Sequence, residues 1–220
     1  MSEHSSPSQG VPIGALFDDF AADYLDVRDA VGWSPWPHIE DALGDAHVPL
    51  TGQRILDVGC GGGSVMEALA QRGAQVVGVD ASEQMCALAA ERLPTAPLHW
   101  RNLEQGLPWP DHSFDATLAL GCLEFVAAIE EACLELIRVT RPGGRLLYVV
   151  EICGPHVDGG EAKAVTLYET WTRYRRPLAD VRAFAQHHLV EVEVIEIPGY
   201  VQDDSGLLVK YARVIGQVPA

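Results

Sequence analysis

The chain has 220 residues, of which 48% are hydrophobic, and a formal net charge of −16. This size and apolar content suffice for one well-packed domain with short appendages and exclude a second fold of comparable size. The acidic balance argues against a nucleic-acid partner, because such binding depends on basic contacts to phosphates. The five cysteines include no Cys-x-x-Cys pair, which predicts reduced thiols and a cytoplasmic protein.

The start of the chain is predicted to be a disordered tail. Residues 1–12 are rich in Ser, Pro and Gly and lack the basic and then apolar stretches of a signal peptide. The longest apolar stretch, Ala116 to Ile129, contains Glu124 and is too short to cross a membrane. We therefore expect no membrane association.

A strand and a glycine-rich turn follow at Ile55–Gly63. Glycines at 59, 61, 62 and 63 let a ligand lie against the backbone, which a Cβ would block. Ser64 starts a helical pattern, so the turn is expected between a parallel strand and a helix N-terminus. Nucleotide-like ligands bind at that place in doubly wound sheets.

Two acids at strand ends indicate which nucleotide is bound. Asp80 ends the strand Gln75–Asp80, where a carboxylate accepts hydrogen bonds from both ribose hydroxyls; the alternative is a helix N-terminal residue ahead of Ser82. Asp57 precedes the turn and would repel a pyrophosphate but attract a cationic amino-acid group, although backbone N–H groups could also satisfy it. Ser64 stands where a dinucleotide fingerprint needs Gly or Ala. The pattern therefore favours a ligand with a ribose and a positive centre over NAD.

The remaining apolar patterns predict an alternating α/β chain. An insertion at 153–177 is predicted to be helical from about Glu161. In chain order, the other elements are strands at Leu98–Arg101 and Phe114–Leu120, a helix at Ile129–Ile137, a strand at Arg145–Val150, a helix at Leu178–His188, and strands at 189–197 and 207–215.

Four of these segments together resemble the class I S-adenosylmethionine-dependent methyltransferases. They are Leu56–Gly63, Val77–Ser82, Leu107–Asp115 and Arg138–Arg145, and their joint occurrence is more specific than any one of them. The resemblance implies a doubly wound, mostly parallel seven-stranded Rossmann-like sheet with an antiparallel C-terminal edge strand, in three α/β/α layers. It also implies a helical lid at 13–50, a cofactor-binding domain at 51–220 with a lid insertion at about 153–177, and methyl transfer from S-adenosylmethionine to a small-molecule acceptor.

The resemblance also assigns cofactor contacts. Asn102 stands where the family usually has Asp facing the adenine amino group, and Glu104 is its rival for that role. Tyr24 resembles a lid tyrosine that packs over the cofactor. The other contacts implied are Asp57, Gly59, Cys60 and Gly61 for the methionine part, Asp80 for the ribose, Ala81 for the adenine, and Leu103, Leu120 and Gly121 closing the site.

The acceptor side is less defined. Methyl transfer mainly needs alignment of the acceptor with the C–S bond, but a hydroxyl or a protonated amine would benefit from a base. The candidate bases near the strand tips are Glu124, Glu151 and His156, with His38 more remote. His156 and Asp158 are too few ligands for a metal site, and His187 and His188 diverge, so no metal is predicted.

Two side-chain clusters in the insertion have two readings each. Arg173, Arg175 and Arg176 could bind an anionic group of the substrate, but a solvated helix face is favoured. Tyr168, Trp171 and Tyr174 are three apart and would share a helix face that either grips an aromatic acceptor or attaches the lid to the core.

Three alternatives to methyl transfer stay open on this sequence. They are another enzyme using the same cofactor without methylation, a non-catalytic cofactor-binding partner protein and, more distantly, an NAD oxidoreductase. The sequence predicts neither the acceptor, the atom methylated, nor the oligomeric state.

Overall fold

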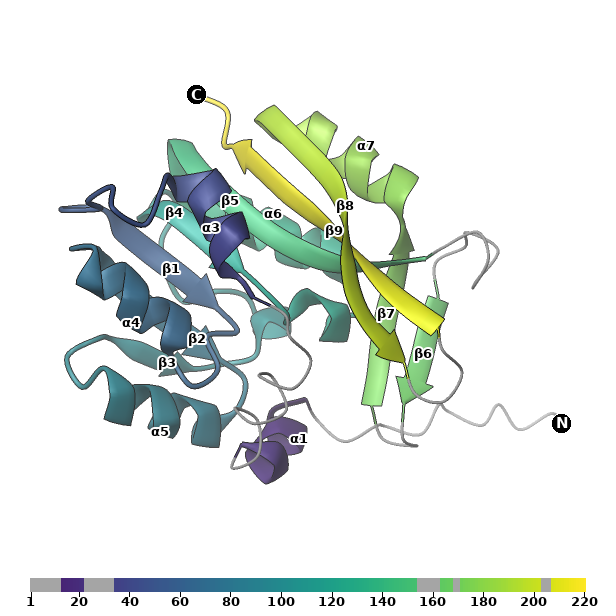
Figure 1. Ribbon diagram of the computed structural model, residues 1–220, viewed down its shortest axis with the longest axis horizontal. Helices are drawn as coiled ribbons and strands as arrows, with labels where there is room; N and C mark the ends of the chain where they lie inside the picture. Colours follow the sequence, from purple (N-terminus) through teal and green to yellow (C-terminus); the bar gives the residue numbers. More distant parts are fainter. Residues whose placement is uncertain (1–12, 22–33, 154–162, 168–170, 203–206) are drawn as a thin grey trace, which may run out of the picture.

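The central sheet consists of short, mostly apolar strands, because helices cover both of its faces. The computed structural model describes residues 13–21, 34–153, 163–167, 171–202 and 207–220. Five parallel strands lie in the order β3-β2-β1-β4-β5 (Figure 1). They are β1 (Arg54–Val58), β2 (Gln75–Asp80), β3 (Leu98–Trp100), β4 (Phe114–Ala119) and β5 (Thr140–Cys153).

Two C-terminal strands extend this sheet beyond β5. Strand β9 (Leu207–Gln217) runs antiparallel to β5, and β8 (Val190–Gln202) pairs antiparallel with β9. The predicted seven-stranded sheet is therefore confirmed. The antiparallel strand β9 lies one position inside the edge, which β8 occupies.

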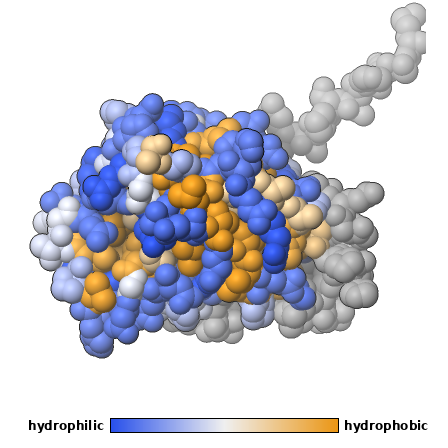
Figure 2. Space-filling view, turned by 90° about the horizontal axis from the view of Figure 1, so that it is seen from above, coloured by the Kyte–Doolittle hydropathy of each residue, from blue (hydrophilic) through white to orange (hydrophobic). Residues whose placement is uncertain are grey.

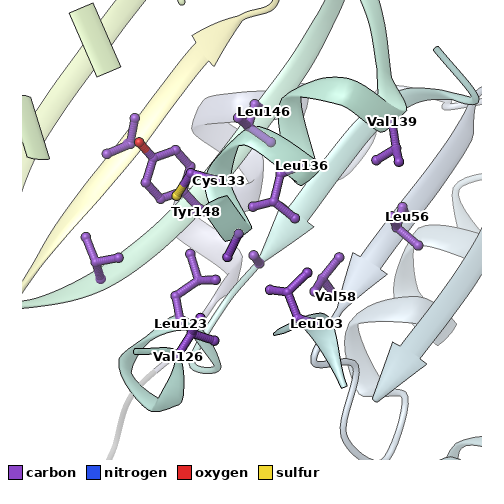
Figure 3. Packing of buried hydrophobic residues seen from close by; sticks show 14 of the residues in the cluster. Leu56, Val58, Leu103, Leu123, Val126, Cys133, Leu136, Val139, Leu146 and Tyr148 are labelled. Carbon is purple, nitrogen blue, oxygen red and sulfur yellow. The ribbon is translucent and has the colours of Figure 1, made fainter. Parts of the chain in front are cut away.

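Helices form a layer on each face of the sheet, as predicted, because neighbouring residues of a strand point to opposite faces. Ile55 and Leu147 belong to one buried cluster with side chains of α3 and α4. Leu56 and Leu146 belong to another with side chains of α6 and α7, and Figure 3 shows them with Leu136 and Val139 of α6. The described helices are α1 (Ile13–Phe20), α3 (Trp36–Leu43), α4 (Ser64–Gln71), α5 (Glu83–Arg92), α6 (Ile129–Val139), α7 (Leu178–His188) and the short 3-10 helices η1 (Leu103–Gln105) and η2 (Leu123–Phe125).

The insertion between β5 and α7 is not the helix predicted from about Glu161. Its described residues form an antiparallel hairpin of β6 (Lys163–Leu167) and β7 (Trp171–Pro177). Arg173 and Arg175 are both buried, which follows the two-residue period of a strand. The predicted helical face of aromatic residues is therefore wrong, and Tyr168 lies outside the described residues.

The hairpin is placed over the end of β4. Ile152 of β5 pairs with Arg176 of β7 on one edge and with Lys210 of β9 on the other. Strand β9 occupies one edge of β5. On the other edge, β4 pairs with β5 only as far as Tyr148, and β7 pairs with β5 beyond that residue. The insertion therefore lies beside the carboxyl ends of the parallel strands (Figure 1).

The surface in Figure 2 is mostly hydrophilic, with an apolar area near the middle of that face. Large apolar side chains exposed on the described part of the molecule include Val190, Ile195 and Trp36. Among the described helices, none is long and apolar enough to cross a membrane.

Candidate functional site

A cavity opens at the carboxyl ends of β1, β2 and β4. It holds about 680 Å³, part of it open to solvent. Seven of the residues predicted for the cofactor line it: Gly59, Gly61, Asp80, Ala81, Asn102, Leu103 and Gly121. Sequence reasoning missed the other lining residues, which are Ile13, Phe17, Val58, Val79, Met85, Arg101, Cys122, Phe125 and Val126.

Two further predicted contacts, Cys60 and Leu120, have side chains outside the cavity. Cys60, whose contact is predicted through its backbone, has its side chain in the apolar cluster beneath α3 and α4, and Leu120 packs against that cluster. Neither side chain lines the cavity. At the glycine turn the cavity wall consists of backbone atoms. Tyr24 and His156 lie outside the described residues, so their predicted roles stay predictions.

The glycine turn needs residues without a side chain. Gly59 and Gly61 have φ values of 69° and 50°, in the left-handed region that disfavours side chains. A Cβ on Gly59 would also overlap the Cβ of Cys122. The sequence therefore leaves the cavity floor as bare backbone where β1 passes into α4.

Asp80 is held firmly at the cavity wall. One carboxylate oxygen accepts the N–H of Gly61 at 2.8 Å and the other accepts the N–H of Ser82 at 2.9 Å. Ser82, not Asp80, caps α5 by accepting the N–H of Met85. Burial raises the pKa of Asp80, and these backbone bonds oppose that shift. A carboxylate has lone pairs beyond the two used here, so this one can still accept hydroxyl donors from the cavity.

Asp57, a predicted cofactor contact, does not line the cavity; it is a buried acid with an unsatisfied oxygen. Its side chain is 3% exposed, and Oδ2 has no hydrogen-bond partner among the described residues. Burial, and secondly the nearby Asp80, raise the pKa of Asp57 to about 7. Backbone N–H groups therefore do not satisfy this oxygen, contrary to the alternative that the sequence left open for Asp57. A cation reaching it would favour the charged form.

The loop after β3 separates the two rivals for the adenine contact. Asn102 lines the cavity, and its Oδ1 accepts the N–H of Glu104 at 2.9 Å, which fixes the amide. The Glu104 carboxylate turns to the N–H of Ala127 at 3.2 Å. The geometry therefore favours Asn102 over Glu104.

Helix α1 covers the cavity. Ile13 and Phe17 line it, and the Phe17 ring lies edge to face against Phe125, with 5.3 Å between centroids. At the other side, Asp18 accepts the Ser82 hydroxyl at 2.6 Å. These contacts attach α1 to both rims of the cavity.

The two acids predicted as bases are ion-paired. Arg173 places Nη2 3.0 Å from Glu124 and Nε 2.6 Å from Glu151. Arg175 places Nε 2.5 Å from the other oxygen of Glu151. All four side chains are buried, so the solvated helix face predicted for the arginines is wrong. Buried acids at the tips of β4 and β5 explain why these arginines are turned inward.

His38, the more remote of the predicted bases, does not line the cavity. His38 is on α3, where burial and then Arg213 lower its pKa, and Asp41 opposes that shift. No group of three or more metal-ligating side chains occurs among the described residues. The absence of a metal stays a prediction.

Comparison with known proteins identifies the family. A family model described as a methyltransferase domain matches residues 56–148, the segment that carries the glycine turn, Asp80 and the end of β4. The segment 56–148 belongs to the class I S-adenosylmethionine-dependent methyltransferase family. It contains all seven predicted residues that line the cavity.

Relatives of this methyltransferase domain include enzymes of quinone biosynthesis. A demethylmenaquinone methyltransferase of Renibacterium salmoninarum is 34% identical over 156 residues, which cover 70% of this chain and 65% of that protein. A ubiquinone biosynthesis O-methyltransferase of Rhizobium rhizogenes is 38% identical over 107 residues, 47% of this chain and 43% of that protein. This chain therefore spans about half the length of these relatives.

The fold has solved counterparts. One is the Burkholderia thailandensis 1,6-didemethyltoxoflavin-N1-methyltransferase with bound 1,6-didemethyltoxoflavin and S-adenosylhomocysteine. It superposes with a TM-score of 0.66 at 19% identity, covering 98% of this chain and 94% of that chain. At this identity the likeness shows the fold alone.

Proposed function

We propose that this protein transfers the methyl group of S-adenosylmethionine to a small-molecule acceptor by in-line displacement. The observation that carries the proposal is the pair of acids that end β1 and β2. Asp80 is fixed at the cavity with spare acceptor capacity, and Asp57 keeps a buried oxygen without a partner in the described structure. A ribose diol and an amino-acid ammonium satisfy these two needs, and S-adenosylmethionine carries both groups.

The bound cofactor supplies a methyl group already activated by its sulfonium. The residues of this chain bind and orient the cofactor, and they keep water from the reacting atoms. Asp80 and the bare turn at Gly59–Gly61 hold the nucleoside and amino-acid ends. Phe17 and Phe125 close the cavity from above with an apolar pair, which limits the access of water to the methyl group.

For the acceptor we propose a hydroxylated aromatic ring of the quinol type. The support is the wall of Ile13, Phe17, Phe125 and Val126, which suits a flat apolar ring, together with the two families of quinone-modifying relatives. Glu124 lies in sequence between the cavity-lining Cys122 and Phe125, but its own side chain is buried outside the cavity wall, paired with Arg173 and hydrogen-bonded by Tyr211. We propose it as the carboxylate that takes the proton of an acceptor hydroxyl, because it is the acid next to the apolar wall formed by Phe125 and Val126.

Glu151 has a different role in this proposal. Both of its oxygens contact arginines, with Arg173 on one and Arg175 on the other. It therefore supports the wall behind Glu124 rather than acting as a base. The cytoplasmic location and the lack of a nucleic-acid partner stay predictions.

The test uses the purified protein with methyl-labelled S-adenosylmethionine and a panel of reduced naphthoquinones, reduced benzoquinones, catechols, indoles and primary amines. We expect label in a quinol or catechol and release of equimolar S-adenosylhomocysteine. Product formation with the cofactor recovered intact would show a non-methylating enzyme. Binding of S-adenosylhomocysteine without turnover of any compound would favour a partner protein, and preferential binding of NADH in a calorimetric titration would refute the cofactor.

A further inference from the structure

The hairpin β6–β7 is attached to the main sheet by little backbone. Its strand β7 pairs with β5 at two positions, Ile152 with Arg176 and Cys153 with Pro177. The buried side chains of Arg173 and Arg175 supply further attachment, because both reach Glu151 on β5. Side-chain ion pairs therefore contribute much of what holds this insertion against the carboxyl end of the sheet.

Arg173 reaches further than Arg175 does. Besides Glu151, its guanidinium contacts Glu124 of η2 and donates to the Tyr211 hydroxyl at 2.6 Å. It also lies over the Phe125 ring, with Cζ 5.3 Å from the centroid. The planar fork of arginine can meet two carboxylates and stack on an aromatic face at once, which a lysine ammonium cannot do.

Phe125 connects Arg173 to the cavity. Its ring lines the cavity and meets Phe17 of α1 edge to face. Asp18, the next residue of α1, is bound to Ser82 on the opposite rim and also accepts the N–H of Gln84 at 3.0 Å. Helix α1 thus has one anchor on the ribose side of the cavity and a second anchor that depends on Phe125.

We propose that Arg173 is a positioning residue for methyl transfer, holding Phe125, and through it helix α1, closed over the bound cofactor. The inference rests on the proposed function for its effect on turnover. The closure of α1 itself is measurable with cofactor product alone. Arg173 acts on α1 through Phe125. It also pairs with Glu124, the proposed base, so turnover alone does not separate the two routes, whereas the exchange of the α1 amides reports only the first.

Hydrogen exchange of the α1 amides tests the closure. Wild type, Arg173→Met and Arg175→Met are compared with and without saturating S-adenosylhomocysteine, following peptides that contain Ile13–Phe20. We expect the ligand to slow exchange of these amides in wild type and in Arg175→Met, and the Arg173→Met variant to lose at least tenfold of that protection. Arg175→Met is the matched control, because it removes a buried arginine bound to the same Glu151 from the same strand.

Equal protection of α1 in Arg173→Met and wild type would overturn the proposal, as would equal loss in both methionine variants. If Arg173→Met does not fold, Phe125→Leu replaces it, since this change leaves the ion pairs and removes the stacking ring. Phe125→Leu should then show the same loss of α1 protection, and full protection would again refute the mechanism.

Turnover of the acceptor found in the panel gives the second readout. We expect kcat to fall at least tenfold in Arg173→Met, to recover in part in Arg173→Lys, and to stay within twofold of wild type in Arg175→Met. A purely structural role would lower the unfolding temperature of both methionine variants alike and leave kcat per folded molecule unchanged. If no acceptor is turned over by wild type, the proposed function fails while the exchange experiment still decides the role of Arg173.

Discussion

Replacing Asp57 by asparagine should stabilise the protein without ligand and weaken its binding of the cofactor. The pKa of Asp57 rises from 3.8 to about 7 in the folded protein, and a rise of about 3 units corresponds to about 4 kcal/mol at ~1.4 kcal/mol per unit. The folded chain keeps this proton up to about pH 7, whereas the unfolded chain releases it near its ordinary value. The contribution of Asp57 to wild-type stability is therefore fully present below that value and is lost as the pH rises to about 7.

The amide of Asp57→Asn has no such titration. Both proteins are unfolded with urea, without ligand, at pH 5 and at pH 8.5. Between these pH values the free energy of unfolding of the variant should rise by about 3 kcal/mol relative to that of wild type, because this much of the Asp57 contribution is lost between pH 5 and 7. A difference that does not change with pH would refute this reasoning. A variant that loses stability relative to wild type as the pH rises would refute it as well.

Ligand binding supplies the second half of the test. Asp57→Asn should bind S-adenosylhomocysteine at least tenfold more weakly at pH 8, because the ligand ammonium loses its charged partner. Methylthioadenosine, which has the nucleoside and lacks the amino acid, should bind both proteins equally. In wild type the affinity for S-adenosylhomocysteine should fall as the pH drops below about 7, since the acid must then be deprotonated for binding. Equal loss for both ligands would show that Asp57 only supports the turn.

Three further substitutions test other contacts of the site. Asp80→Ala removes two ribose acceptors worth about 1.5–3 kcal/mol each, so calorimetry should show at least a tenfold weaker binding of S-adenosylhomocysteine, and unchanged affinity would remove Asp80 from the site. Gly59→Ala places a Cβ against Cys122 at a φ of 69°, which should lower the free energy of unfolding by about 2 kcal/mol or more; a loss below about 0.5 kcal/mol would contradict the overlap. Asp18→Ala removes the hydrogen bond to Ser82 and should weaken cofactor binding several-fold. An unchanged unfolding temperature would show that the effect is confined to α1.

The cofactor half of the molecule could be predicted because each of its features is local in sequence. The turn at Gly59–Gly61, the acid Asp80 and the loop at Asn102 each follow a strand that reads as apolar. Parallel strands bring their carboxyl ends to one edge, so the sequence order alone brings these three segments together. The helices that begin at Ser64, Ile129 and Leu178 and the two closing strands were predicted from their strong periods.

The acceptor half could not be predicted because its contacts join segments far apart in the chain. Arg173 lies 49 residues from Glu124 and 38 from Tyr211, and nothing local reveals that these side chains meet. The two-residue spacing of Arg173 and Arg175 fits a strand, whereas the predicted helix depended on the three-residue spacing of the aromatic residues. Burial of two arginines also runs against the usual preference of charged residues for the surface.

The hairpin β6–β7 supports the acceptor side of the proposed site, and the residues on that side come from a different part of the sequence than those on the donor side. The predicted contacts with the donor come mostly from residues 57–121, whereas the side chains that support Glu124 and Phe125 on the proposed acceptor side come from β5, β7 and β9, all later in the chain. Since the backbone of the insertion meets β5 at only two pairs, its length and side chains can be exchanged with few changes to the rest of the sheet. Grafted hairpins that keep the equivalents of Arg173 and Arg175 offer a route to new acceptors at constant affinity for the methyl donor.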